Sequence, residues 1–382
     1  MTEILKRTVL FERHVQLGGR MVPFGGWEMP VQYDGIKAEH LGVRKHGGIF
    51  DISHMGEFMI QGPLACSFLN QLLTNNVEKL HPGQGQYTLM CQENGGVIDD
   101  LYLYCLEPGN YLMIVNAARS ETDWQWLETQ WRAFTSKSDA LCCENQSDSW
   151  GAIAIQGPKV RAWIDTCFLP ETGVNGNTLA ALAKNHIGRF MFKSNEVWIG
   201  VTGYTGEDGF EVIAPSHLVP DIWDTLLLKG QSESLQPAGL GARDTLRTEM
   251  CYPLYGQELT METTPIEAGL GFFVDLEKGP FMGREILSRQ KRERPEKRSI
   301  AFKMTGRSAP PRPGYQVFSS DDKVIGTVTS GTASPSLNQG IGLAYVWENH
   351  AKAGQSITIE IRGNRFPAII VKKPIYRLSG SA

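Results

Sequence analysis

Several kinds of sequence signal are absent from this chain of 382 residues, and each absence excludes a class of protein. No stretch approaches the ~20 consecutive apolar residues that a membrane-spanning helix requires. Residues 1–9 have two basic side chains but no apolar core, so we expect no secretory signal. The formal net charge is only −4, whereas nonspecific binding of nucleic acid needs a broad basic surface. We therefore expect a protein that binds neither membranes nor nucleic acid.

The common signatures of metal and nucleotide sites are missing as well. The seven cysteines are odd in number and form no C-x-x-C pair, which indicates reduced thiols in a cytosol-like compartment. There is no H-E-x-x-H motif, so we predict neither a catalytic nor a structural metal. The phosphate-binding motif of nucleotide hydrolases is absent, and Gly239-Leu240-Gly241 does not extend to a dinucleotide fingerprint. A flavin or nicotinamide enzyme is therefore not supported.

A short internal repeat indicates two related lobes of mixed α/β structure. Residues 59–63 (MIQGP) and 154–158 (AIQGP) each read as an apolar strand that ends at glycine. A proline comes next, where its missing N–H costs nothing in a first helical turn. The next segments, 64–73 and 159–168, carry apolar residues at helical spacing, so we expect a helix in both places.

An antiparallel pattern lies between the two copies of this repeat. Residues 86–92 are expected to form a strand, 93–96 (ENGG) a hairpin turn and 97–106 the return strand. Residues 111–116 are expected to form a third strand. Further on, expected strands at 196–202 and 210–213 flank a turn with three glycines.

The length and a change in composition give the domain organisation. With 41% hydrophobic and 20% charged residues, the chain resembles a globular enzyme of two to three domains. Residues 283–298 hold seven basic residues against three Glu and read as an exposed helix and linker. We expect residues 1–283 to form two discontinuous lobes, one of them at roughly 52–145. Residues 284–298 would be the linker, and 299–382 a small all-β domain, either a barrel or a jelly roll.

The return strand carries the first candidate for chemistry. Alternation places Ile98, Asp100, Tyr102 and Tyr104 on one face. A carboxylate beside two phenols suits a pocket that holds a flat heteroaromatic ligand and handles a proton. From the pattern alone, the favoured interpretation of Asp100 is a satisfied strand or turn carboxylate. Asp99 lies nearer the turn and is a candidate to cap the hairpin.

Two glycine-containing clusters are further candidates. In residues 203–211 (GYTGEDGFE), three glycines allow close backbone approach, and Glu211 lies on the next strand. A carboxylate suits the amidine-like edge of a pterin because it accepts two parallel N–H bonds. Glu207 and Asp208 are interpreted as solvated hairpin residues.

In residues 237–247, Arg243 lies near a helix N-terminus, where a ligand carboxylate and an internal salt bridge are equally compatible partners. His54 is interpreted as a hydrogen-bonded structural histidine, since no acid partner can be named.

Taken together, these segments resemble the T-protein family of the glycine cleavage system across nearly the whole chain and in the family's order. The matching segments are residues 19–24 (GRMVPF), 50–57 (FDISHMGE), 86–90 (QYTLM), 95–101 (GGVIDDL), 203–211 (GYTGEDGFE), 239–246 (GLGARDTL), 253–256 (PLYG), 263–269 (TTPIEAG), 330–332 (SGT) and 343–346 (LAYV).

The resemblance implies an α+β fold, a three-domain cloverleaf in which two related mixed α/β lobes and a C-terminal β domain surround tetrahydrofolate. Position by position, the family's essential aspartate corresponds to Asp100. Its pterin- and folate-contacting residues correspond to Tyr87, Tyr204, Glu211 and Arg243, with Tyr104 nearby. A C-terminal tyrosine of the family corresponds to Tyr376.

The resemblance also implies the reaction, in which a lipoylated H protein delivers an aminomethyl group. The products are ammonia, the dihydrolipoyl carrier and 5,10-methylenetetrahydrofolate, with Asp100 orienting the folate and stabilising positive charge. Two alternatives remain at this point: a related folate-dependent demethylase, and a non-catalytic folate-binding protein of iron–sulfur cluster assembly. The family-like sequence starts within about ten residues of Met1, so we expect a bacterial cytoplasmic protein, or a mitochondrial matrix protein if the source is eukaryotic.

Overall fold

The structure, a computed structural model, describes residues 4–134, 140–170 and 178–377. The chain divides into two compact units. Unit 1 comprises Met1–Leu72, Asn76–Thr88 and Leu101–Arg243, and unit 2 comprises Leu73–Asn75, Leu89–Asp100 and Asp244–Ala382. Within the described ranges, no helix is long and apolar enough to cross a membrane. The expected domain boundaries at residues 283 and 299 stay predictions.

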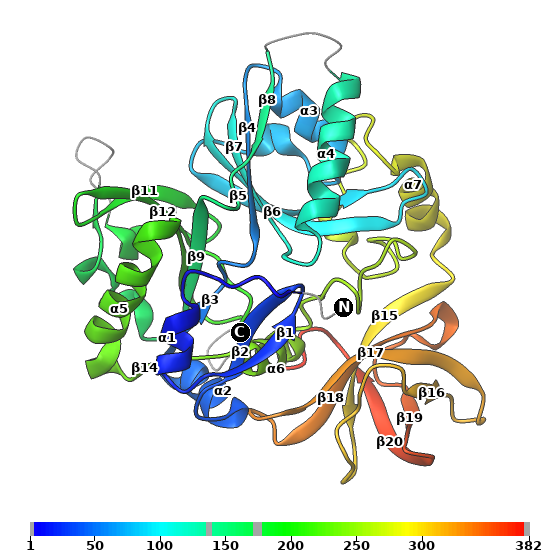
Figure 1. Cartoon of the computed structure of the whole chain (residues 1–382). Helices are drawn as coiled ribbons and strands as arrows, with labels where there is room; N and C mark the ends of the chain where they lie inside the picture. The colour runs from blue at the N-terminus through cyan, green and yellow to red at the C-terminus, as the bar shows by residue number, and fades with distance from the viewer. Residues whose placement is uncertain (1–3, 135–139, 171–177, 378–382) are drawn as a thin grey trace. The chain divides into compact units, whose positions relative to one another are not determined.

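A seven-stranded sheet is the centre of unit 1 (Figure 1). In order across the sheet its strands are β10 (Leu169–Pro170), β11 (Ile187–Phe192), β12 (Asn195–Gly200), β13 (Gly209–Pro215), β9 (Trp150–Gln156), β3 (Gly47–Asp51) and β14 (Leu235–Pro237). All neighbours are antiparallel except β14 and β3, which run parallel. The inner strand β9 is buried along almost its whole length and reads as an apolar run up to Gln156, as the repeat at 154–158 predicted.

Helix α5 (Val219–Gly230) covers the core of this sheet. Val219, Ile222, Trp223 and Leu226 are all buried and have the i, i+3, i+4, i+7 spacing of one helical face. Each such side chain contributes about 1.5–3 kcal/mol when it leaves water. A shorter helix α2 (Ile36–Lys45) contacts β3 and β14. Helix α1 (Phe11–Gln16) and the hairpin of β1 (Arg20–Phe24) and β2 (Trp27–Gln32) complete the N-terminal part of unit 1.

A second sheet has the order β5-β6-β7-β4-β8. Its strands are β5 (Gln84–Cys91), β6 (Val97–Glu107), β7 (Asn110–Val115), β4 (Gly56–Gln61) and β8 (Cys142–Asn145), with helices α3 (Ala65–Leu72) and α4 (Ser120–Phe134). The expected hairpin at 86–106 and the third strand are thus confirmed. Gln92 N–H donates to the Gly96 carbonyl at 2.9 Å, and Gly95 adopts φ +81°, which closes the turn.

The two copies of the repeat differ in the secondary structure that comes after the glycine. After β4 the chain forms the expected helix α3, but after β9 the expected helix at 159–168 is wrong. Two short 3₁₀ turns, Val160–Ala162 and Ile164–Thr166, stand there instead. Three of these residues, Val160, Ile164 and Thr166, are β-branched, which lowers the tendency to extend an α-helix.

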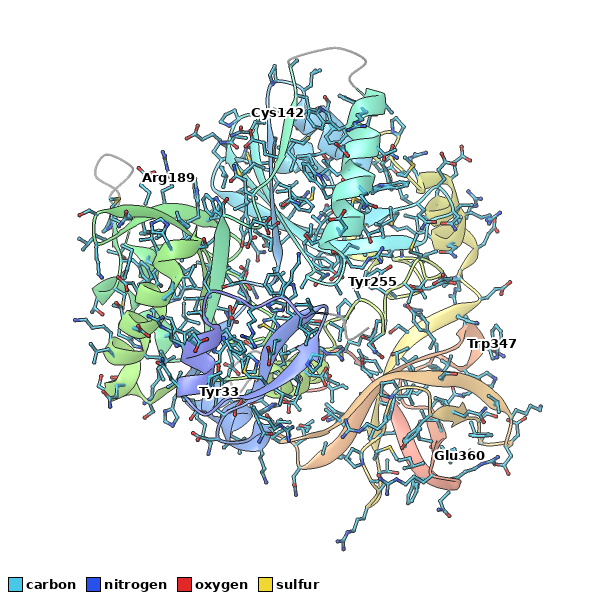
Figure 2. All side chains as sticks on the ribbon, in the orientation of Figure 1. Tyr33, Cys142, Arg189, Tyr255, Trp347 and Glu360 are labelled. Atoms are coloured by element: carbon cyan, nitrogen blue, oxygen red, sulfur yellow. The ribbon has the colours of Figure 1, made fainter. Side chains whose placement is uncertain are left out.

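A closed barrel is the core of unit 2, so the expected all-β C-terminal domain is a barrel (Figure 1). Its strands, in order, are β15 (Lys297–Met304), β18 (Gln339–Trp347), β17 (Val324–Ser334), β16 (Gln316–Phe318), β19 (Ser356–Ile361) and β20 (Asn364–Val371), and β20 pairs with β15. Ile300, Phe302 and Met304 alternate along β15 and point into the barrel core. Figure 2 shows Trp347 at the outer end of β18, where 43% of its surface is exposed.

The outer wall of the barrel is joined to the rest of unit 2 by apolar and ionic contacts. Ala301 and Leu343 pack with Cys251, which comes directly after helix α6 (Leu240–Met250). Arg247 of α6 is 3% exposed, and its Nη1 donates to Glu258 at 3.1 Å while its Nη2 donates to Ser330 Oγ of β17 at 2.9 Å. Because the guanidinium distributes several donors over fixed acceptors, it fixes the helix against the barrel wall. Helix α7 (Arg284–Glu293) precedes β15, as the basic segment predicted.

Gly157, the glycine directly after β9 in the second copy of the repeat, can be tested by substitution. Gly157 has φ +146°, and a Cβ there would lie 2.6 Å from Gly47 Cα and 2.6 Å from the His46 carbonyl. We expect Gly157→Ala to lower the free energy of unfolding by roughly 2–3 kcal/mol, because neither backbone neighbour can move away. Urea unfolding followed by circular dichroism measures the change.

Gly18→Ala is the matched control. Gly18 also has positive φ, +75°, but no atom lies within 4 Å of the position of its Cβ. The Gly18→Ala variant should lose only ~1 kcal/mol of unfolding free energy, which is the cost of a left-handed backbone conformation for alanine. Equal losses in the two variants would show that the close approach at Gly157 contributes nothing.

Candidate active site

A buried glutamine organises the glycine-rich loop, residues 201–208, which joins β12 to β13. Gln156 is 0% exposed and pairs in register with Gly48 on one side and Gly209 on the other. Its Nε2 donates to the Thr202 carbonyl at 3.0 Å, and its Oε1 accepts from Thr205 Oγ1 at 3.0 Å. The side chain of one strand thus satisfies a backbone carbonyl and a hydroxyl of the loop, which holds the loop in place at Thr202 and Thr205.

The glycines of the loop are required by this packing. A Cβ on Gly203 would overlap the amide of Gln156, and a Cβ on Gly209 would lie 2.7 Å from its Nε2. Gly206 adopts φ +83°, a conformation that glycine reaches at no steric cost. Two of the three glycines predicted to allow close approach, Gly203 and Gly209, therefore approach a side chain of the protein itself.

A chain of hydroxyl hydrogen bonds leads from β6 to Glu211. Tyr104 OH lies 2.9 Å from Thr202 Oγ1, and Thr202 Oγ1 donates to Glu211 Oε2 at 2.6 Å. Tyr104 is fully buried, whereas Glu211 is partly exposed. Gly200, which pairs with Glu211, leaves room for the phenol, since a Cβ there would lie 2.5 Å from the Tyr104 hydroxyl. The carboxylate is therefore held at one oxygen by the fold.

Two phenols share the face of β6 that the alternation predicted. The rings of Tyr102 and Tyr104 lie 4.8 Å apart between centroids. Burial raises the pKa of both hydroxyls far above the usual value, and the negative charge of Glu211 raises the two pKa values further. Both phenols are therefore neutral donors near neutral pH. The Tyr102 hydroxyl is buried and has no hydrogen-bond partner in the described ranges.

Arg243 lies in the first turn of α6 and stacks on a tyrosine. Its guanidinium carbon is 4.7 Å from the centroid of the Tyr204 ring. Burial lowers the pKa of Arg243, and the carboxylate of Glu211 opposes that change. Arg243 forms no ion pair with any described residue, its Nη1 is buried without a partner, and the neighbouring Asp244 binds Arg247 instead. The sequence left two partners open for Arg243, a ligand carboxylate and an internal salt bridge. Among the described residues, the structure excludes the internal salt bridge.

The two other acids of the loop both form ion pairs, and the prediction that they are solvated is wrong for Glu207 only, since 46% of the Asp208 side chain is exposed. Glu207 Oε1 lies 2.8 Å from Arg44 Nη1, and the two side chains are only 6% and 4% exposed. Asp208 accepts two bonds from Arg161, at 2.6 and 2.9 Å, and this pairing lowers the pKa of Asp208. Sequence reasoning missed both pairs because the arginines lie 163 and 47 residues away in the chain.

His54 is buried, but no hydrogen bond joins its ring to any described residue, so the interpretation as a hydrogen-bonded histidine is wrong for the described part of the chain. Its Nδ1 has no partner among the described residues, and the ring packs edge-on against Phe24 at 5.8 Å. Burial lowers its pKa to about 4; the charge of Asp51 opposes this shift and that of Arg243 adds to it. His54 is therefore neutral at neutral pH. The carboxylate of Asp51 is engaged elsewhere, with His14 Nε2 at 2.9 Å and with Thr8.

In unit 2, the hairpin that carries Asp100 is anchored by two of the family-like segments. Val97 N–H lies 3.1 Å from the Thr260 carbonyl and 3.0 Å from that of Thr263, and Tyr255 OH donates to the Val97 carbonyl at 3.2 Å. The strand then continues through Asp99 and Asp100, which are 0% and 9% exposed. Both aspartates are therefore buried on a rigid strand, and Asp99 does not sit at the exposed end of a turn.

The remaining candidates can be placed one by one. In unit 1 the structure brings together Tyr104, Glu211, Arg243 and Tyr204, which come from β6, β13, α6 and the glycine-rich loop. Tyr87 lies on β5 and is partly exposed. In unit 2, Tyr376 lies beyond the last barrel strand, and its N–H donates to the Glu249 carbonyl of α6 at 3.0 Å. The roles of these residues toward a ligand stay predictions.

Two residues near Glu211 were not among the predicted site residues, namely Thr202 and Tyr102. Strand alternation had already placed Tyr102 beside Tyr104, so a signal for it existed. Thr202 was visible only as the end of a strand, because nothing in the sequence gives its contact with Tyr104, 98 residues away. In the described part of the chain, no group of three or more His, Cys, Asp or Glu side chains could hold a metal ion.

Comparison with known proteins defines the class of protein to which this fold and site belong. Residues 10–278 match the family model described as the GCVT N-terminal domain, and residues 297–377 match the glycine cleavage T-protein C-terminal barrel domain. The chain therefore belongs to the glycine cleavage T-protein family, and it is a transferase.

Relatives match over the whole length. An aminomethyltransferase of Geobacillus kaustophilus is 43% identical over 381 residues, covering 98% of this chain and 99% of the relative. One of Symbiobacterium thermophilum is 43% identical over 381 residues, covering 99% of each chain. The crystal structure of glycine cleavage system aminomethyltransferase T from Bartonella henselae has a TM-score of 0.88 at 30% identity and covers 98% of this chain and 99% of that one. The resemblance and the fold class inferred from the sequence are confirmed.

The buried histidine predicts how stability depends on pH. The unfolded chain has a histidine pKa of about 6.5, so between pH 7 and pH 5 it binds more protons at His54 than the folded chain does. This residue should therefore reduce the free energy of unfolding by about 2 kcal/mol as the pH falls from 7 to 5. Urea unfolding at both pH values, for the native chain and for His54→Asn, measures the effect. The same pH dependence in both proteins would contradict a lowered pKa at His54.

Proposed function

We propose that this aminomethyltransferase takes the aminomethyl group from the lipoylated H protein of the glycine cleavage system and transfers its carbon to tetrahydrofolate. Tetrahydrofolate is a co-substrate in this reaction, and its N5 and N10 each form a bond to the transferred carbon and each give up a proton, which leave with the ammonia and the lipoyl thiol. The carbon–sulfur bond to the lipoyl arm and the carbon–nitrogen bond to the amine both break. The products are 5,10-methylenetetrahydrofolate, ammonia and the dihydrolipoyl H protein. Both reacting groups belong to bound partners, so the protein mainly positions them and excludes water.

The observation that carries this proposal is the arrangement of Glu211 and Arg243. Glu211 is held at Oε2 by Thr202, while its Oε1 has no hydrogen bond to any described residue. Arg243 lies beside it, with a buried Nη1 that has no partner among the described residues. A buried donor without a partner costs about 1–3 kcal/mol, which a ligand acceptor recovers. The Glu211 carboxylate suits the amidine-like edge of a pterin, and the Arg243 cation suits a carboxylate or carbonyl oxygen. A reduced folate offers both kinds of group.

Further polar atoms support a ligand of this kind in unit 1. Tyr102 OH and Gln86 Nε2 are also buried and without partners among the described residues. Both are neutral donors and lie on the paired strands β6 and β5. Fused heterocycles such as pterins offer ring nitrogens and a carbonyl as acceptors, whereas an apolar ligand would leave all these donors unpaired. We assign Tyr87, Tyr104, Tyr204, Glu211 and Arg243 to folate binding, and Tyr376 on the weaker basis of the family resemblance alone.

Asp100 is the residue that we propose as the essential carboxylate. Its position in segment 95–101 matches the family's aspartate, and the anchored strand holds it with little freedom. An ionised carboxylate there would orient the co-substrate and stabilise the positive charge that develops when ammonia leaves. Preorganised charge of this kind is effective because it needs no rearrangement during the reaction.

The domain organisation and the cellular compartment belong to the same proposal. The two family models, at 10–278 and 297–377, support a folate-binding region at 1–283, a linker at 284–298 and a β domain at 299–382. Bacterial relatives and seven free cysteines support a reducing cytoplasm. The demethylase and iron–sulfur alternatives gain no support, since aminomethyltransferases match over the full length.

Ammonia release from aminomethylated H protein, with and without tetrahydrofolate, tests the proposed function. Release that depends strongly on tetrahydrofolate, with 5,10-methylenetetrahydrofolate as a product, is the expected result. Tetrahydrofolate binding without release from this donor would contradict the assigned donor, and methyl-sulfonium and methyl-amine donors would then be tried.

Replacing Asp100 tests its role. Asp100→Asn keeps the shape of the side chain but removes its charge, so we expect normal folding and folate binding with a kcat at least about 100-fold lower. Steady-state ammonia release measures turnover, and a thermal unfolding curve serves as the folding control. Unchanged turnover would remove Asp100 from the mechanism.

A further inference from the structure

The hydrogen bonds around Thr202 have only one consistent direction. The carboxylate of Glu211 has no hydrogen to donate, so the single Thr202 O–H points to Glu211 Oε2, at 2.6 Å. The Thr202 oxygen must then accept from Tyr104 O–H, at 2.9 Å. Tyr104 remains a donor near neutral pH because it is fully buried beside that carboxylate. The order is therefore Tyr104 to Thr202 to Glu211.

Every member of this chain is fixed by the fold. Tyr104 is a residue of β6, and Glu211 is paired on β13 with Gly200 of β12 and Ala154 of β9. The Thr202 carbonyl is held by Gln156 Nε2 at 3.0 Å, so its backbone cannot shift. Its β-branched side chain also has restricted χ1 rotamers, which keeps the hydroxyl between its two partners. The free Glu211 Oε1 is thereby left in a single orientation.

From this geometry we infer that Thr202 is a positioning residue for the folate reaction, acting through Glu211 and supported by Tyr104. The inference rests on the proposed function, in which Glu211 binds the heterocycle of tetrahydrofolate. Thr202 itself makes no contact with the reacting atoms. Its hydroxyl occupies one carboxylate oxygen and aligns the other with the N–H donors of the ligand. Tyr104 thereby acts through Thr202, in addition to any contact of its own with the ligand.

Two replacements of Thr202 separate the hydroxyl from the shape of the side chain. Thr202→Val keeps the β-branch and removes the hydroxyl, and Thr202→Ser keeps the hydroxyl. Hydrogen bonds to charged groups contribute about 1.5–3 kcal/mol, so we expect Thr202→Val to raise the KM and the Kd for tetrahydrofolate at least tenfold. The kcat should change less than twofold, because Glu211 binds the co-substrate and does not take part in bond breaking. Thr202→Ser should stay within threefold of the native chain.

Thr358→Val is the matched control. Thr358 lies on β19, and its Oγ1 is buried without a partner in the described part of the chain. The same loss of a hydroxyl there should leave the KM and the Kd for tetrahydrofolate unchanged. Glu211→Ala supplies the second test, because Thr202→Val should add less than a twofold loss in that background.

Titration with tetrahydrofolate under anaerobic conditions and steady-state ammonia release give these values. A native Kd for Thr202→Val would overturn the inference while leaving the proposed function intact. Equal losses in Thr202→Val and Thr202→Ser, or a full tenfold loss in the Glu211→Ala background, would also overturn it. A native chain that binds no tetrahydrofolate would overturn the proposed function and the inference with it.

Discussion

The arrangement of the site in unit 1 depends on one buried amide. Gln156 ends the inner strand β9, which lies between β3 and β13, and its side chain is fully buried, with no access to water. An amide in that position must find both donors and acceptors inside the protein. It finds them in the loop between β12 and β13, at the Thr202 carbonyl and the Thr205 hydroxyl. That single requirement fixes the course of the loop, the absence of side chains at Gly203 and Gly209, and the positions of Thr202 and Glu211.

Charges in unit 1 fall into two groups that serve different purposes. The pairs Arg44–Glu207 and Arg161–Asp208 are complete, because each carboxylate meets a guanidinium at short distance. Glu211 and Arg243 lie near one another but form no ion pair, and each retains a polar atom without a partner in the described chain. The Arg243 Nη1 is buried, so leaving it in this state reduces stability, a cost that a ligand acceptor would remove. The complete pairs hold the loop in place, and the incomplete groups remain available for recognition.

Much of the architecture could be predicted from local patterns in the sequence. The turn at 93–96 specifies its hairpin, since Gly95 accepts a positive φ and Val97–Glu107 is rich in β-branched, aromatic and other apolar residues. The all-β character of the C-terminal domain was predictable from short alternating runs between glycines and prolines, whereas the choice between a barrel and a jelly roll was not. The helix expected at 159–168 failed because apolar spacing does not distinguish an α-helix from successive 3₁₀ turns, and its β-branched residues favoured the latter.

By itself the sequence determined the family, the mixed α/β and all-β classes and the candidate residues, because these depend on local spacing and on motifs in a fixed order. Tertiary structure decided which candidate residues keep a polar atom without a hydrogen-bond partner among the described residues. Glu207 and Asp208 look as suitable as Glu211 in the motif, but arginines 163 and 47 residues away complete their bonds. Thr202 became significant only when Tyr104, 98 residues distant, was placed against it. Hydrogen bonds and burial depend on distances in space, and no pattern along the chain encodes these long-range pairings directly.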